Sequence, residues 1–196
     1  MLAKPANQDY PRTHQSEPRD EAGKGDAVKA VIIHATGDAD VLRLEEVERP
    51  EPGEDEVLIR VQAAAVNPVD WKYRRGLVQR ELPAVLGEDV SGAVAVSRAD
   101  GFAPGMKVFG VTMSGGYAEY ATASATAIAI KPEALSHEQA AALPVSGLTA
   151  WQALFDRGCL ELGQAVLVAG AAGGVGHLAV QFAKYAGARA IGTGSA

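Results

Sequence analysis

Cysteine, long apolar runs and long charged runs are all scarce in this sequence, and each scarcity excludes a class of protein. The one cysteine, Cys159, rules out an intramolecular disulfide and a zinc site built from several thiolates. No apolar stretch approaches the roughly 18 residues of a membrane helix, and the N-terminus lacks the pattern of a secretory signal. We therefore expect a soluble, cytoplasmic protein that does not interact with membranes.

Basic residues are also few for a chain of this length. The 196 residues include 18 Lys and Arg against 24 Asp and Glu, which gives a formal net charge of −6. Nucleic-acid binding requires a concentrated basic surface, so we expect no nucleic-acid partner. A hydrophobic content of 47% with 21% charged residues is typical of a globular chain with one large domain or two small ones.

Residues 1–27 combine charged residues with Pro, Gln and Gly and show no apolar periodicity. We predict that they form a disordered tail, either a natural flexible extension or additional residues ahead of the true start. The first strand is predicted to begin at Val28, where an apolar run starts abruptly.

Residues 28–131 are predicted to form a domain of short β-strands. Apolar residues alternate with others from Val57 to Ala65 after a Pro-Gly turn, which is the pattern of a strand with one buried face. Many short strands separated by turn residues favour a compact β-barrel or sandwich. The other strands are predicted over residues 28–33, 90–96, 107–111, 117–122 and 126–130.

The pattern changes from strands to helices after Lys131. Ser136 and Gln139 have the spacing of a capping box, which predicts a helix that starts at this point. A second helix is predicted over residues 148–155.

The last third of the chain has the pattern of one βαβ unit. The apolar run over residues 165–169 predicts a strand buried on both faces of a parallel sheet. An amphipathic helix over residues 175–186 and a strand over residues 189–193 follow it.

A glycine-rich segment, residues 170–176, lies between that strand and that helix. Glycines let a backbone approach a pyrophosphate, and the free N–H groups of a helix N-terminus attract its negative charge. Ala171, Gly173 and Gly176 match a dinucleotide-binding fingerprint that has alanine at its first glycine position. A plain tight turn is the alternative, but the strand before it and the helix after it favour a dinucleotide site.

Residues 191–196 indicate which dinucleotide would bind. In NAD-dependent folds a carboxylate in this window accepts a hydrogen bond from the ribose 2′-hydroxyl, but this window contains none. Because no negative charge would repel a 2′-phosphate, we expect NADPH to be preferred over NADH. Thr193 and Ser195 are the candidate cofactor-binding residues in this window.

Five motifs together resemble a known family. They are NPVDWK (67–72), LGEDVSG (86–92), GGYAEY (115–120), LPVSGLTA (143–150) and GAAGGVG (170–176). Their combination and order resemble the zinc-independent quinone oxidoreductase branch of the medium-chain dehydrogenase/reductase superfamily.

The resemblance implies a fold of mixed β and α/β class. A GroES-like β-barrel domain would cover residues 28–131 and provide the substrate side of the site. Linker helices and the first βαβ unit of an incomplete Rossmann domain, a doubly wound parallel sheet, would cover residues 132–196. NADPH would bind in the cleft between them and transfer a hydride to a quinone, or to another activated alkene or conjugated carbonyl.

The resemblance also implies that no zinc is bound. Zinc-dependent relatives hold a metal at the positions that correspond to Asn67, the Glu88-Asp89 pair and the region of Val145. These positions provide neither a thiolate nor an imidazole. The histidines show no metal-ligand spacing either; they are His14, His34, His137 and His177.

Roles for single residues follow from the same resemblance. Asn67 would lie beside the nicotinamide and the substrate, while Lys72 and Tyr73 are candidate proton donors, with a plain surface position as the alternative. Asp70 and Asp89 are expected to fix loops by accepting hydrogen bonds rather than to catalyse. The residues expected to bind the cofactor are Thr149, Gly170, Ala171, Gly173, Gly174, Val175, Gly176, Thr193 and Ser195.

Two other functions stay open. One is an enoyl-thioester reductase, although Leu77 and Val78 stand where some such relatives have a tyrosine. The other is an inactive or partner-dependent fragment, because a doubly wound dinucleotide domain has more strands than the two predicted here. We therefore expect either a homo-oligomer or a missing C-terminal half, and association through the unpaired strand over residues 165–169.

Overall fold

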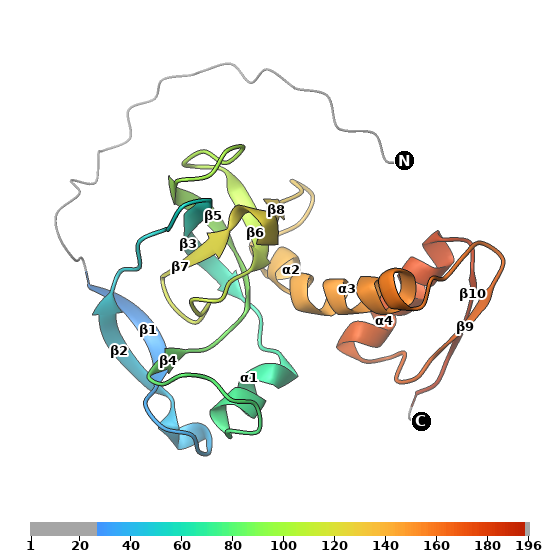
Figure 1. Ribbon diagram of the computed structural model, residues 1–196, viewed down its shortest axis with the longest axis horizontal. Coiled ribbons are helices and arrows are strands. Elements are labelled where there is room, and N and C mark those ends of the chain that lie inside the picture. The colour runs from blue at the N-terminus through green and yellow to red at the C-terminus, as the bar shows by residue number, and fades with distance from the viewer. Residues whose placement is uncertain (1–26, 195–196) are drawn as a thin grey trace.

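The computed structural model describes residues 27–194, which form a β-rich part, a helical connection and a smaller βαβ part (Figure 1). The first strand begins at Ala27, one residue before the predicted start. The tail predicted over residues 1–27 lies outside the described residues, apart from Ala27.

The larger sheet is antiparallel, with the strand order β7-β3-β5-β6-β8. Its interior is apolar, and Val57, Ile59, Val90 and Val108 are all fully buried. The predicted alternation along β3 is incomplete, because Leu58 is also buried. Helix α2 (His137–Ala141) packs against β3 and β5. The strands are β3 (Glu56–Ala64), β5 (Asp89–Ser97), β6 (Lys107–Val111), β7 (Tyr120–Ser124) and β8 (Ile128–Ile130).

A three-stranded antiparallel sheet, β2-β1-β4, completes the β-rich part. Tyr117 and Ala118, predicted to start β7, instead contact β1: Val31 N–H donates to Tyr117 O at 2.8 Å, and Ala118 forms a bridge with Ala30. The two sheets therefore curl together as the predicted GroES-like domain does. The strands are β1 (Ala27–Ile33), β2 (Arg43–Glu48) and β4 (Ala84–Val85).

Two helices connect the β-rich part to the βαβ part. Helix α2 (His137–Ala141) has the predicted capping box, in which Ser136 Oγ accepts from Gln139 N–H at 3.2 Å. Helix α3 (Pro144–Trp151) begins a turn earlier than predicted, because Pro144 suits a first helical position that needs no N–H donor. It continues as a π-helix, η3 (Gln152–Arg157).

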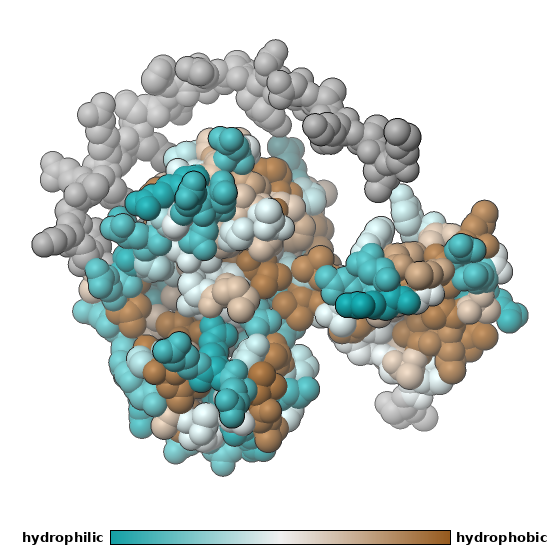
Figure 2. All heavy atoms as spheres, viewed as in Figure 1, coloured by the Kyte–Doolittle hydropathy of each residue, from teal (hydrophilic) through white to brown (hydrophobic). Residues whose placement is uncertain are grey.

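The predicted βαβ unit is confirmed. Strands β9 (Ala165–Val168) and β10 (Arg189–Gly192) are parallel, and α4 (Gly174–Tyr185) connects them. The prediction that the first strand is buried on both faces is wrong: Val168 is buried, but Leu167 is 66% exposed. Helix α4 covers one face of this two-stranded sheet, and hydrophobic residues stay visible over β9 and β10 (Figure 2).

Candidate functional site

Asn67 precedes helix α1 (Pro68–Arg74) in the β-rich part of the molecule. Its backbone N–H donates to Asp70 Oδ2 at 2.7 Å, and its side chain faces the Asp70 backbone N–H in a capping box. Pro68 occupies the first helical position, where no N–H is needed. Asn67 is 9% exposed, so the residue expected beside the nicotinamide is held rigidly by the start of α1.

Asp70 joins α1 to two other segments. Its carboxylate accepts from the Gly87 N–H at 3.1 Å and from the Tyr117 hydroxyl at 2.8 Å. Gly87 has φ +89°, and a Cβ there would collide with the Tyr117 ring, so only glycine fits. Burial and the nearby Asp70 raise the pKa of Tyr117, so its hydroxyl keeps the proton that it donates. The expectation that Asp70 fixes loop conformation is confirmed.

Asp89, the first residue of β5, is a fully buried carboxylate. Its Oδ2 accepts from Asn67 Nδ2 at 2.9 Å, and its Oδ1 accepts from the Val145 backbone N–H at 2.9 Å. Burial raises the pKa of Asp89 to about 6; Glu88 and Asp70 add to the rise, while the two hydrogen bonds oppose it. The structural role expected of Asp89 is confirmed, since it connects β5, α1 and α3.

The two candidate proton donors differ in their surroundings. Lys72 is exposed, and its Nζ lies 6.0 Å from the centre of the Trp71 ring. Tyr73 is half-buried: its hydroxyl donates to Glu88 Oε1 at 3.1 Å, and Arg80 lies over its ring at 5.3 Å. Burial and Glu88 raise the pKa of Tyr73. Lys72 therefore lies on the surface, and the Tyr73 hydroxyl keeps its proton in a hydrogen bond to Glu88.

The positions that would hold zinc in metal-dependent relatives are close together but chemically unsuited to it. Asn67 and Val145 each donate an N–H to Asp89, so both oxygens of this carboxylate already accept a hydrogen bond. Residues 27–194 contain no group of three or more His, Cys, Asp or Glu side chains that could hold one metal ion. Zinc independence stays a prediction that these contacts support.

The glycine-rich turn forms the connection from β9 to α4. Gly173 is the N-cap residue of this 12-residue helix and has no side chain that could accept from the first N–H groups. These N–H groups are therefore available to bind a ligand. A Cβ at Gly170 would meet nothing within 4 Å, whereas one at Gly176 would collide with Gly170 O and lie 2.8 Å from Ala171 Cα. Gly176 therefore serves close packing, Gly170 faces open space, and a Cβ at Gly173 would lie 3.3 Å from Gly170 O. This arrangement fits a bound pyrophosphate.

The other predicted cofactor residues lie around this turn and on α3. Thr193 follows β10, and its Oγ1 accepts from the Gly170 N–H at 3.2 Å while its carbonyl accepts from Ala171 N–H at 2.7 Å. Thr149 is exposed on α3 and donates its hydroxyl to Val145 O at 2.6 Å. Ser195 lies outside the described residues.

Ser146 was not among the predicted site residues, but it lies next to the glycine-rich turn. Its Oγ lies 3.5 Å from the position of a Cβ on Gly174, the first residue of α4. The hydroxyl makes no hydrogen bond with any other part of residues 27–194, so it can turn toward a ligand at the turn. No pattern in the sequence marks this contact, because it depends on how α3 packs against α4.

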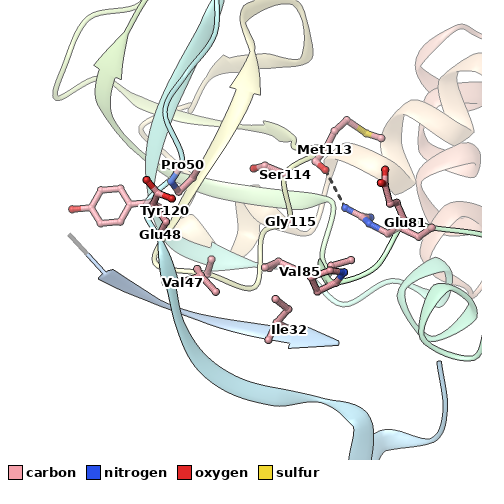
Figure 3. A pocket seen from close by; sticks show the side chains of 14 residues that line it. Ile32, Val47, Glu48, Pro50, Glu81, Val85, Met113, Ser114, Gly115 and Tyr120 are labelled. Carbon is pink, nitrogen blue, oxygen red and sulfur yellow. Dashed lines mark hydrogen bonds between the residues drawn. The ribbon is translucent and has the colours of Figure 1, made fainter. Parts of the chain in front are cut away.

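Of two cavities on the surface, one adjoins the glycine-rich turn and the other lies away from the predicted site residues. One of about 430 Å³ adjoins the glycine-rich turn and is lined by apolar residues of α3, η3, β9 and α4, including Leu154, Val168 and Val175. Another of about 400 Å³ opens among β1, β2, β4 and the loop after β6, where Arg80 donates to Met113 O at 3.0 Å (Figure 3). Its described lining contains none of the predicted site residues, so we place the candidate site at the turn and α1.

In the part of the chain that the structure describes, no helix is both long enough and apolar enough to cross a membrane.

Comparisons with known proteins agree with the fold described above. The family model of the alcohol dehydrogenase GroES-like domain matches residues 53–133. Human quinone oxidoreductase is 40% identical over 172 residues, which cover 85% of this chain and 52% of that protein. The chain thus spans about half the length of the curated relatives that it matches.

Solved structures show the same likeness. A quinone oxidoreductase from Coxiella burnetii has a TM-score of 0.79 and 40% identity, over 87% of this chain and 57% of that chain. A mycobacterial protein in complex with NADPH has a TM-score of 0.80 and 37% identity, over 86% of this chain and 52% of that chain. The predicted fold class, a GroES-like domain followed by part of a Rossmann domain, is confirmed.

Proposed function

The chain belongs to the medium-chain dehydrogenase/reductase superfamily as a relative of its quinone oxidoreductases, and from this premise we propose an NADPH-dependent reductase activity. The acceptor is a quinone or another conjugated carbonyl. The observation that carries the proposal is the glycine-rich turn at the N-terminus of α4, with open space beside Gly170.

The turn and its neighbours hold the cofactor phosphates. The free N–H groups at the start of α4 donate to the pyrophosphate, and the helix dipole favours its negative charge. Thr193 fixes the first residues of the turn through its hydrogen bonds to Gly170 and Ala171. The absence of a carboxylate over residues 191–196 supports NADPH over NADH.

The nicotinamide end lies toward Asn67 and Thr149. Bound NADPH supplies a hydride to the acceptor. Asn67 positions the nicotinamide and the acceptor, because its amide is fixed by Asp89 and by the start of α1. Lys72 and Tyr73 are the candidates that return a proton to the reduced acceptor, and the acceptor is reduced without zinc.

The experiment is a binding titration with a matched pair of glycine variants. Purified chain is titrated with NADPH and with NADH, and NADPH oxidation is then followed with a quinone, an enone and an enoyl thioester. Gly173→Ala adds a methyl group at the glycine-rich turn, where its nearest contact is Gly170 O at 3.3 Å. Gly53→Ala is the control, because its nearest contact, Glu56 Oε2, is also at 3.3 Å but lies in the β-rich part.

We expect Gly173→Ala to weaken NADPH binding at least about tenfold while both variants unfold at similar denaturant concentrations. A wild-type chain that binds neither dinucleotide, or a Gly173→Ala variant that binds as tightly as wild type, would contradict the proposal. Binding without turnover would favour the inactive or partner-dependent alternative, and turnover of the enoyl thioester alone would favour the other reductase.

A further inference from the structure

The buried carboxylate of Asp89 lies between the two halves of the candidate site. One of its oxygens accepts from the side chain of Asn67, which precedes α1 in the β-rich part. The other accepts from the backbone N–H of Val145, in the first turn of α3. Asp89 itself is 0% exposed, so water does not compete for either hydrogen bond.

These contacts fix which way the Asn67 amide points. A carboxylate accepts hydrogen bonds, so the Asn67 NH2 group must face Asp89, and the amide oxygen must face the other way. The amide oxygen therefore faces the first turn of α1, where the Asn67 side chain takes part in the capping box with Asp70. Asp89 and α1 therefore determine the orientation of the amide together.

Val145 connects the same carboxylate to the glycine-rich turn. Val145 is the second residue of α3, a position where a backbone N–H has no acceptor within its own helix, and Asp89 provides that acceptor. The next residue, Ser146, lies against Gly174 at the start of α4. One short path thus leads from Asn67 through Asp89 and the first turn of α3 to the turn proposed to hold the pyrophosphate.

We propose that Asp89 is a positioning residue, which sets the placement of the Asn67 amide relative to the glycine-rich turn and thereby aligns the two ends of the dinucleotide. The inference rests on the proposed function, because it assigns the two ends of the path to the nicotinamide and the pyrophosphate. The link itself, from Asn67 to Val145 through Asp89, is a property of the folded chain and can be tested without any cofactor.

The test exchanges the two side chains of the pair. In Asp89→Asn, the new amide can still accept from Val145 N–H through its oxygen, but its NH2 group then faces the NH2 group of Asn67. In the double variant Asn67→Asp with Asp89→Asn, the NH2 group at position 89 faces a carboxylate at position 67. The hydrogen bond can therefore form again, with donor and acceptor exchanged. Asp100→Asn, an exposed change of the same charge, is the control.

Amide hydrogen exchange at Val145 is the first readout, because its N–H donates to Asp89. We expect Asp89→Asn to speed this exchange at least about tenfold, the double variant to restore most of the protection, and Asp100→Asn to change nothing. A purely local packing role would not be rescued by the exchange of side chains. Unchanged exchange in Asp89→Asn, or no recovery in the double variant, overturns the proposal.

NADPH affinity is the second readout, and it separates this inference from the proposed function. We expect Asp89→Asn to weaken NADPH binding about tenfold, although the altered side chain lies on β5 and not in the glycine-rich turn. Altered exchange with unaltered affinity overturns the alignment role of Asp89. If the wild-type chain binds no NADPH, the proposed function is wrong. Amide hydrogen exchange at Val145 still decides whether Asp89 couples Asn67 to α3.

Discussion

Tyr117 illustrates how much one hydroxyl contributes to the candidate site, since it donates to the buried Asp70 at 2.8 Å. Tyr117→Phe keeps the ring against Gly87 but leaves Asp70 with one hydrogen bond fewer. We expect the free energy of unfolding to fall by about 1–3 kcal/mol, because a bond to a buried charged group is lost. Chemical denaturation measures this change. Tyr120→Phe, whose ring stacks with Arg49, is the control, and an equal loss in both variants would contradict the prediction.

We expect Asp89 to make the free energy of unfolding depend on pH. Its folded-state pKa is raised to about 6 from 3.8 by burial, so the folded state binds the proton more tightly than the unfolded state. The stabilisation from this group is therefore present below about pH 4 and is lost as the pH rises through about pH 6.

The measurement is the difference in unfolding free energy between wild type and Asp89→Asn at several pH values. Between about pH 4 and pH 7, we expect wild type to lose about 1–3 kcal/mol of unfolding free energy relative to Asp89→Asn, because only wild type carries the titrating group. Asp100→Asn, exposed on a loop, should show no such trend. A pH-independent difference for Asp89→Asn would disprove the assignment.

At the scale of single elements, the capping box of α2 is a local device that the sequence predicts correctly. Ser136 Oγ accepts from Gln139 N–H, and Gln139 Oε1 accepts from Ser136 N–H at 2.9 Å. Ser136→Ala should lower the free energy of unfolding by about 1 kcal/mol, whereas Ser136→Asp should retain it because a carboxylate also caps a helix. Thermal unfolding tests this, and equal losses in both variants would show that the cap does not matter.

Elements with strong local patterns are the ones that the sequence predicts. The strand from Glu56 to Ala64 and the helix from Gly174 to Tyr185 have a clear apolar period, and both are found nearly where expected. Strand β2 (Arg43–Glu48) was missed because it has two apolar residues among four charged ones, and it forms through pairing with β1. Helix α1 was missed because its seven residues are held by tertiary hydrogen bonds of Asp70.

At the scale of the whole molecule, the sequence predicts the members of the site but not their connections. The glycine-rich turn was predicted from its own residues, because the strand and helix that flank it have local patterns. The bond between Asp89 and Val145 joins residues 56 positions apart, and neither residue type indicates a partner. The contact of Ser146 with Gly174 likewise follows only from the packing of α3 on α4.

The uncovered face of the β9–β10 sheet leads to a prediction about association. Leu167 and Ile191 are neighbours in the parallel register and are 66% and 46% exposed. They alternate with Val166, Val168 and Ala190, which pack in the core with α4. Burial of two such side chains contributes several kcal/mol, so we expect copies of the chain to associate through this face.

Sedimentation over a range of concentrations measures this association. Replacing both Leu167 and Ile191 by lysine should raise the dissociation constant at least about tenfold, because two charges would have to be buried or separated. Leu44→Lys is the control, since Leu44 is 71% exposed but lies on β2, in the β-rich part. If the wild-type chain stays monomeric at all concentrations, or if Leu44→Lys disperses it equally well, then this face is not where the copies meet.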